Sequence, residues 1–195
     1  MKKVLRSEIL PLGEYEAVRD PFRARVIREK KARRIPLGEH ATCVFENHDS
    51  VLMQIQEMLR TERITKESSI QHETDTYNAL VPGDLEVSAT VMIEINDNAA
   101  REAFLTAAKG LEDALTLDVD GESSRATYQV PHAPANRTTA VHYLKFPLSA
   151  AAAKKLAGAT KGDLPVALVS SHPAYTVRAA LSASVVASLA EDFAR

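Results

Sequence analysis

The chain has 195 residues, enough for one substantial hydrophobic core. Apolar residues make up 45% of it, charged residues 26%, and the formal net charge is −2 at pH 7. This balance excludes any general electrostatic attraction to nucleic acid or to an anionic membrane. The single cysteine, Cys43, excludes an intrachain disulfide, and no segment has the length of a membrane-spanning helix. We therefore expect a cytoplasmic protein without membrane contact.

The first part of the chain, residues 1–82, is expected to be mainly helical, with one strand. Asp20-Pro21 is typical of a helix start, and Asp49 or Ser50 can cap a later helix. The expected elements in chain order are helices over 14–18 and 22–34, a strand over 35–46, and helices over 49–61 and 66–80.

The second part, residues 83–195, repeats one order of elements twice. The first unit is expected to contain a strand over 90–95, a helix over 98–108, and hairpin strands over 114–119 and 125–130. The second unit is expected to contain a strand over 141–146, a helix over 150–157, and hairpin strands over 166–169 and 175–181, before a last helix over 184–193. The pattern predicts an α+β fold, in which an N-terminal helical layer packs on a mostly antiparallel sheet made of two tandem strand-helix-strand-strand units. The two parts are expected to form one compact domain.

Glu73 is the most unusual residue of the helix expected over 66–80. The spacing of Ile70, Glu73, Tyr77 and Leu80 places a carboxylate within an apolar stripe. Burial of a lone carboxylate costs free energy, so Glu73 should have a cation, a metal ion or a proton as its partner.

A metal site is one hypothesis that supplies this partner. Carboxylates and imidazoles together suit iron, manganese or zinc. The candidate ligands are His72, Glu73, Glu57, Glu46, His142 and His48. Their spacing matches neither a His-Glu-x-x-His motif nor a Glu-x-x-His motif, so the hypothesis depends on residue types alone.

A structural ion pair is the alternative, because buried charges are normally paired. Bidentate hydrogen bonding from an arginine, with support from Tyr15 or Tyr77, would satisfy the Glu73 carboxylate. The candidate arginines are Arg25, Arg28 and Arg60.

His142 and His172 each have two interpretations. His142 shares a strand face with Leu144 and Phe146, so we expect a core histidine there, although it also belongs to the candidate metal ligands. His172 and Tyr175 lie in a hairpin loop, where functional residues concentrate; a plain turn is the competing interpretation.

The basic run over 23–34 could suit phosphate or RNA. No aromatic residues alternate with its basic positions, and its charges occupy several helix faces. We therefore expect a solvated helix and no nucleic-acid binding.

Several segments together resemble the bacterial family catalogued as domain of unknown function 3501. They span 10–15, 22–27, 44–47, 51–60, 71–80, 142–146 and 172–175. The family has no established activity, so no catalytic residue can be transferred. Its members are often encoded near rubrerythrin-like and iron–sulfur oxidoreductase proteins, so the resemblance implies an iron, redox or oxidative-stress setting and a redox protein partner.

Two function classes follow. The first is a metal-binding protein linked to iron or redox metabolism. The second is a non-enzymatic binding or adaptor protein for a redox partner, with a purely structural Glu73 network. A homodimer is compatible with both, because sheet edges need covering.

Overall fold

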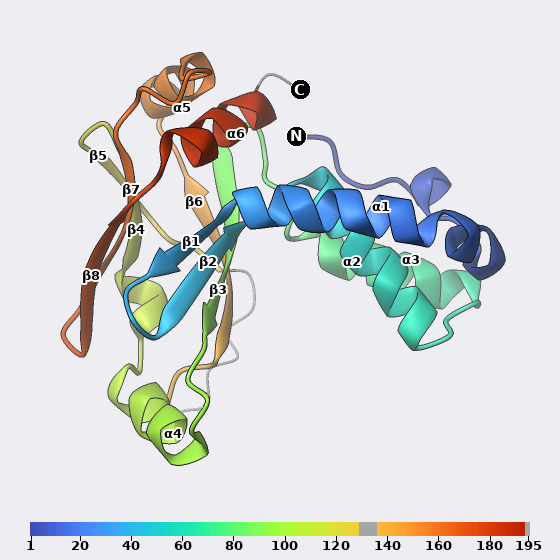
Figure 1. The fold of residues 1–195 in the computed structure, drawn as a ribbon, viewed down its shortest axis with the longest axis horizontal. Coiled ribbons are helices and arrows are strands. Elements are labelled where there is room, and N and C mark those ends of the chain that lie inside the picture. Colours follow the sequence, from blue (N-terminus) through green and yellow to red (C-terminus); the bar gives the residue numbers. More distant parts are fainter. Residues whose placement is uncertain (129–135, 194–195) are drawn as a thin grey trace.

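The computed structural model describes residues 1–128 and 136–193, and these contain two four-stranded antiparallel sheets and six α-helices (Figure 1). The helices are α1 (Leu12–Ala32), α2 (His48–Thr61), α3 (Glu67–Asn78), α4 (Asn98–Ala107), α5 (Ala150–Gly158) and α6 (Ala183–Phe193), with two short 3-10 helices, η1 (Arg6–Glu8) and η2 (Leu111–Ala114). The strands are β1 (Arg34–Leu37), β2 (Ala41–Phe45), β3 (Glu86–Ile93), β4 (Leu115–Val119), β5 (Glu122–Arg125), β6 (Val141–Pro147), β7 (Val166–His172) and β8 (Tyr175–Ala180). The α+β class predicted from the sequence is confirmed. None of the helices in the described ranges is long and apolar enough to cross a lipid bilayer.

The two sheets form a sandwich that is joined along both sides. One sheet has the strand order β1-β2-β3-β6, and the other has the order β5-β4-β7-β8. On one side, the backbone N–H of Thr127 donates to the carbonyl of Lys145 at 2.7 Å, just beyond the end of β5. On the other side, the Tyr175 hydroxyl donates to the Leu37 carbonyl and accepts the backbone N–H of His40 at 3.0 Å. These contacts cover sheet edges that would otherwise be open to pairing.

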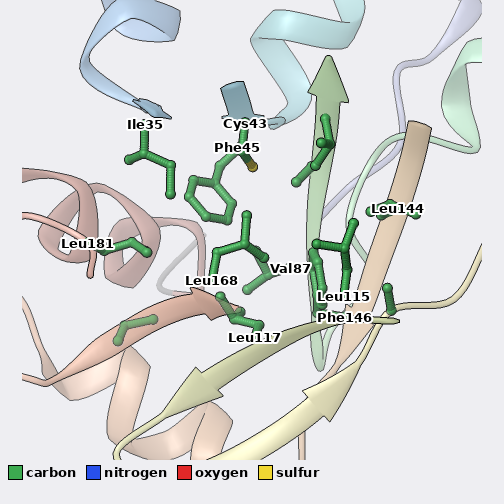
Figure 2. Close-up of a cluster of buried hydrophobic side chains, with 14 of the residues drawn as sticks. Ile35, Cys43, Phe45, Val87, Leu115, Leu117, Leu144, Phe146, Leu168 and Leu181 are labelled. Atoms are coloured by element: carbon green, nitrogen blue, oxygen red, sulfur yellow. The ribbon is translucent and has the colours of Figure 1, made fainter. Parts of the chain in front are cut away.

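The main hydrophobic core lies between the sheets (Figure 2). Successive side chains of a strand point to opposite faces, so alternate residues of each strand enter this core. Phe45 and Phe146 from one sheet meet Leu117 and Leu168 from the other, and all four are fully buried.

The repeated units contribute to both sheets, whereas the sequence predicted a single sheet. The first strands of the units, β3 and β6, pair with each other, while the hairpins β4–β5 and β7–β8 form the facing sheet. This arrangement buries the apolar face of the β3–β6 pair against the apolar face of the two hairpins, which one open sheet could not do. The second hairpin strand was predicted over 125–130, but β5 covers Glu122–Arg125. Positions 129–130 of the predicted strand lie outside the described residues.

Helix α1 is continuous through Pro21, so the helix start expected there is wrong. Both halves of α1 contact α2. The Tyr15 hydroxyl donates to Glu57 at 2.8 Å before the proline, and Arg25 pairs with Asp49 at 2.6 Å after it. Contacts on both sides offset the hydrogen bond that a proline inside a helix removes.

The strand expected over 35–46 is a hairpin instead. Gly38 adopts a left-handed backbone conformation with φ of 72° between β1 and β2. A Cβ atom at this position would lie 2.7 Å from the Tyr175 hydroxyl oxygen, so glycine is required by conformation and by space. After β2, Asn47 caps α2 by accepting the Ser50 N–H at 2.9 Å, so the cap lies two or three residues before the expected Asp49 or Ser50.

Helices α1–α3 stand on the outer side of the β1-β2-β3-β6 sheet and have a small core of their own (Figure 1). Val51, Ile55 and Leu59 follow helical spacing along α2 and are buried with Ile70 of α3. This second core holds α1–α3 together as a unit beside the sheet.

Candidate functional site

A cleft of about 730 Å³ lies between the outer face of the β1-β2-β3-β6 sheet and helices α1–α3. Its walls come from segments far apart in the sequence. The lining residues are Ile27, Lys30, Lys31, Arg34, Val44, Glu46, Ser50, Val51, Met53, Gln54, Tyr77, Leu80, Thr90, Met92, Val141 and Tyr143.

Strand alternation and register build the sheet wall of the cleft. Val44 of β2 lies opposite Thr90 of β3, and Thr90 lies opposite Tyr143 of β6. Met92 lies opposite Val141 one step further along the same face. Their neighbours in sequence point into the inter-sheet core, so this face carries side chains that the core does not use.

Glu46 is the buried charged residue of the cleft, with 6% of its surface exposed. Its Oε1 accepts a hydrogen bond from Thr90 Oγ1 at 2.8 Å, and its Oε2 accepts one from Ser50 Oγ at 2.6 Å. The ammonium of Lys30 lies 3.3 Å from Oε2 and 3.5 Å from Oε1. The position immediately before the N-cap of α2 also favours a negative charge, through the helix dipole.

Helix α1 supplies a basic wall. Ile27, Lys30 and Lys31 follow i, i+3, i+4 spacing and line the cleft together, and Arg34 at the start of β1 extends the row. Lys30 pairs with Glu46, so the wall meets the buried carboxylate directly.

Two tyrosines complete the cleft. Tyr143 on β6 is 53% exposed, and Tyr77 contributes from α3. Partial burial raises the pKa of Tyr143, and the nearby Tyr77 and Glu46 raise it further. Tyr143 therefore presents a neutral phenol at neutral pH, with an apolar ring and a hydroxyl that can donate.

The candidate metal ligands do not converge. The described residues contain no group of three histidine, cysteine, aspartate or glutamate side chains that could hold a metal ion. Of the predicted set, Glu46 lines the cleft, whereas Glu57 contacts α1, His72 is exposed on α3, and His142 faces the inter-sheet region.

The predicted burial of Glu73 is wrong. The buried positions of α3 are Ile70, Thr74 and Asn78, and Glu73 is only partly covered. The Thr74 hydroxyl donates a hydrogen bond to the Ile70 carbonyl at 2.8 Å. The Asn78 side chain accepts from the N–H of Val4 and donates to its carbonyl. Polar side chains can occupy the buried stripe because a local bond satisfies Thr74 and the distant Val4 backbone satisfies Asn78, so the true stripe is one residue away from the expected one. Within the described ranges, Glu73 has no ion pair.

The expected arginine–carboxylate–tyrosine network exists, but around Glu57. Arg19 bonds both carboxylate oxygens of Glu57, at 2.7 and 2.8 Å, and the Tyr15 hydroxyl adds a bond at 2.8 Å. The hydrogen bond from Arg19 lowers the pKa of Glu57, although partial burial opposes this shift.

The arginines proposed as partners of Glu73 lie elsewhere. Arg25 pairs with Glu29 and Asp49, and Arg60 pairs with Glu16. Arg28 is exposed on α1. Tyr77, the proposed supporting tyrosine, lines the cleft instead.

Arg33 is a buried residue that the sequence did not single out. Only 3% of its surface is exposed, and it bonds the carbonyls of Phe45 and Glu46, the carbonyl and hydroxyl of Ser188, and Asp192. It therefore fixes the backbone of Glu46 against α6. The basic run hid this residue, because its neighbours are exposed lysines and arginines.

His142, His172 and Tyr175 all lie away from the cleft. His142 is 6% exposed, and its pKa is lowered by burial, with Glu112 opposing this effect. It is the expected core histidine. In the β7–β8 hairpin, His172 Nε2 lies 3.0 Å from the Lys109 carbonyl, and Tyr175 closes the sandwich against β1. Neither His172 nor Tyr175 lines the cleft.

These features define an α+β protein with a two-sheet sandwich and a helix-flanked cleft. The chain belongs to the family described as "Protein of unknown function (DUF3501)", whose model matches residues 3–193, as the sequence resemblance predicted. It is similar to a crystal structure of a novel protein of unknown function from Burkholderia pseudomallei, with a TM-score of 0.88 and 36% sequence identity. That match covers 98% of this chain and 99% of that chain. No curated protein matches the chain.

Proposed function

We propose that this protein is a non-enzymatic binding protein that holds a small, mainly apolar molecule in the cleft between α1–α3 and the sheet. The observation that carries this proposal is the cleft itself. Its volume of about 730 Å³ lies within the roughly 300–1,000 Å³ typical of small-molecule sites. A few polar groups among mainly apolar walls are the usual composition of such sites.

Exposed apolar side chains gather at this place. Seven large apolar residues are exposed in the described ranges, and three of them, Ile27, Val141 and Tyr143, line the cleft. Scattered exposed apolar residues are ordinary, but a cluster within a hollow indicates an interaction site.

Binding is favoured over catalysis by the chemistry of the lining. No histidine or cysteine lines the cleft in the described part of the chain. Its carboxylate, Glu46, is already engaged by Thr90, Ser50 and Lys30. A general base needs a free lone pair directed at a substrate proton, and these bonds occupy the Glu46 oxygens.

The iron or redox setting implied by the family resemblance stays a prediction. In this setting the protein would serve a redox partner, and Glu46 is the predicted metal ligand that reaches the cleft. Elemental analysis after anaerobic reconstitution with ferrous iron tests it directly. Stoichiometric iron that is lost in Glu46→Gln would favour metal binding over the proposal made above.

Nile red, a neutral apolar dye, tests the binding proposal. The dye is expected to bind saturably, and Val141→Asp is expected to weaken this binding about fivefold or more, because a charge replaces apolar contact area. Leu85→Asp is the matched control, since Leu85 is 48% exposed, Val141 is 42% exposed, and Leu85 does not line the cleft. Absence of saturable binding, or equal losses in the two variants, would refute the proposal.

A further inference from the structure

We infer that the molecule held in the cleft is an amphipathic anion, whose negative headgroup meets the basic wall of α1 while its apolar body lies along β3 and β6. This inference depends on the proposed function and specifies its ligand. It follows from the distribution of charge around the cleft.

The basic wall contains a positive charge that the protein itself does not neutralise. Lys30 pairs with Glu46, and Arg34 pairs with Glu94. Lys31 is exposed at the cleft and has no acidic partner within the described residues. An anion placed there gains an ion pair, whereas a cation is repelled by the Lys31 ammonium.

The opposite wall suits an apolar body. Met92, Val141 and Tyr143 present adjacent apolar surface from β3 and β6, and Val141 and Tyr143 are 42% and 53% exposed to solvent. Covering this surface removes apolar area from water, which is the main source of binding free energy for such a molecule.

The geometry places the headgroup at the mouth of the cleft. Glu46 is buried and negative, so it disfavours a second negative charge at depth. Lys31 is exposed, so a headgroup beside it keeps part of its hydration and avoids the full cost of burying a charge. The volume of about 730 Å³ fits a small molecule.

Isothermal titration calorimetry with three probes tests the charge preference. Decanoate, decanol and decyltrimethylammonium share one alkyl chain and differ in headgroup charge. Decanoate is expected to bind most tightly and decyltrimethylammonium most weakly. Lys31→Gln is expected to reduce decanoate affinity about two- to fivefold, as for a partly exposed ion pair, and to leave decanol unchanged.

Lys154→Gln is the matched control, because Lys154 is exposed on α5 and does not line the cleft. Glu46→Gln should shift affinities in the opposite direction, strengthening decanoate and weakening decyltrimethylammonium, since it removes a negative charge beside Lys30. A thermal unfolding curve for each variant checks that it is folded.

The outcomes separate the two proposals. If all three probes bind equally, or the ammonium binds best, or Lys31→Gln and Lys154→Gln behave alike, the anion inference is wrong while the binding proposal stands. If no probe binds and Nile red also fails to bind, both are wrong.

Discussion

The two faces of the β1-β2-β3-β6 sheet use the same strands for different purposes. On β6, Phe146 points into the inter-sheet core and is fully buried, while Tyr143 points toward the cleft and is 53% exposed. The facing sheet packs against the inner side, whereas α1–α3 stand beside the outer side, where the cleft lies (Figures 1 and 2). Because strand side chains alternate, one strand can stabilise the fold on one face and present a binding surface on the other.

The polar residues of the two faces differ as well. Thr90 and Glu46 on the cleft side bond each other and meet Lys30 from α1. On the core side, His142 is shielded from solvent beside Glu112 and Thr138. Glu46 and His142 are equally buried, each 6% exposed, but the outer group lines the cleft and the inner group does not.

The largest expected difference between the faces is in stability. Phe146→Ala should lower the free energy of unfolding by about 3–5 kcal/mol, because it removes a fully buried ring and leaves a cavity. Tyr143→Ala should lower it by about 1 kcal/mol or less, because half of that side chain is already exposed. Chemical denaturation of both variants measures the contrast. Similar losses would mean that the outer face also belongs to the folding core.

A smaller effect distinguishes two carboxylates of the helices that flank the cleft. Glu57→Gln should cost about 1–2 kcal/mol, because it weakens the bonds from Arg19 and Tyr15. Glu73→Gln should change stability by about 0.5 kcal/mol or less, as is usual at partly exposed positions without partners.

Glu57 and Glu73 should also differ in how they affect stability at acid pH. The folded pKa of Glu57 lies below its unfolded value, so its stabilising contribution is present above the unfolded pKa and is lost as pH falls through the folded pKa. Denaturation curves in acid should therefore lose part of their pH dependence in Glu57→Gln but not in Glu73→Gln. The opposite ranking would restore the buried Glu73 predicted from the sequence.

The smallest expected effect is the titration of His142 on the inner face. Burial holds its pKa below the ordinary value of 6.5, so the unfolded chain takes up the proton first as pH falls. Stability should therefore decline from the unfolded pKa down to the lower folded pKa and then level off. Unfolding free energies between about pH 8 and about pH 5 should show this decline in the native chain and in His72→Gln, and less of it in His142→Gln. An unchanged slope in His142→Gln would place the titrating group elsewhere.

Much of the fold could be predicted because its patterns are local. The alternation on β6 identified His142 as a core residue, and the repeated order of elements identified both units of the second half. The division of those units between two sheets could not be predicted, since it depends on how α4 and α5 lead the chain from one sheet to the other.

The carboxylate network shows the same limit. An arginine, a glutamate and a tyrosine were expected to meet around Glu73, and Arg19 and Tyr15 meet instead around Glu57. The chemistry was predictable because a partly buried carboxylate needs donors. The choice of carboxylate was not, because Thr74 and Asn78 occupy the buried face of α3 in place of Glu73, and Asn78 is satisfied there by the backbone of the distant Val4.

By itself, the sequence determined the α+β class, the order of most elements and the chemistry available to them. These properties are encoded within a few turns or strand steps, where spacing alone decides which side chains share a face. Only the tertiary structure decided that Lys30, Glu46, Thr90 and Tyr143 surround one cleft. These residues are brought together by β-sheet register and helix packing across long sequence separations, which no local pattern specifies.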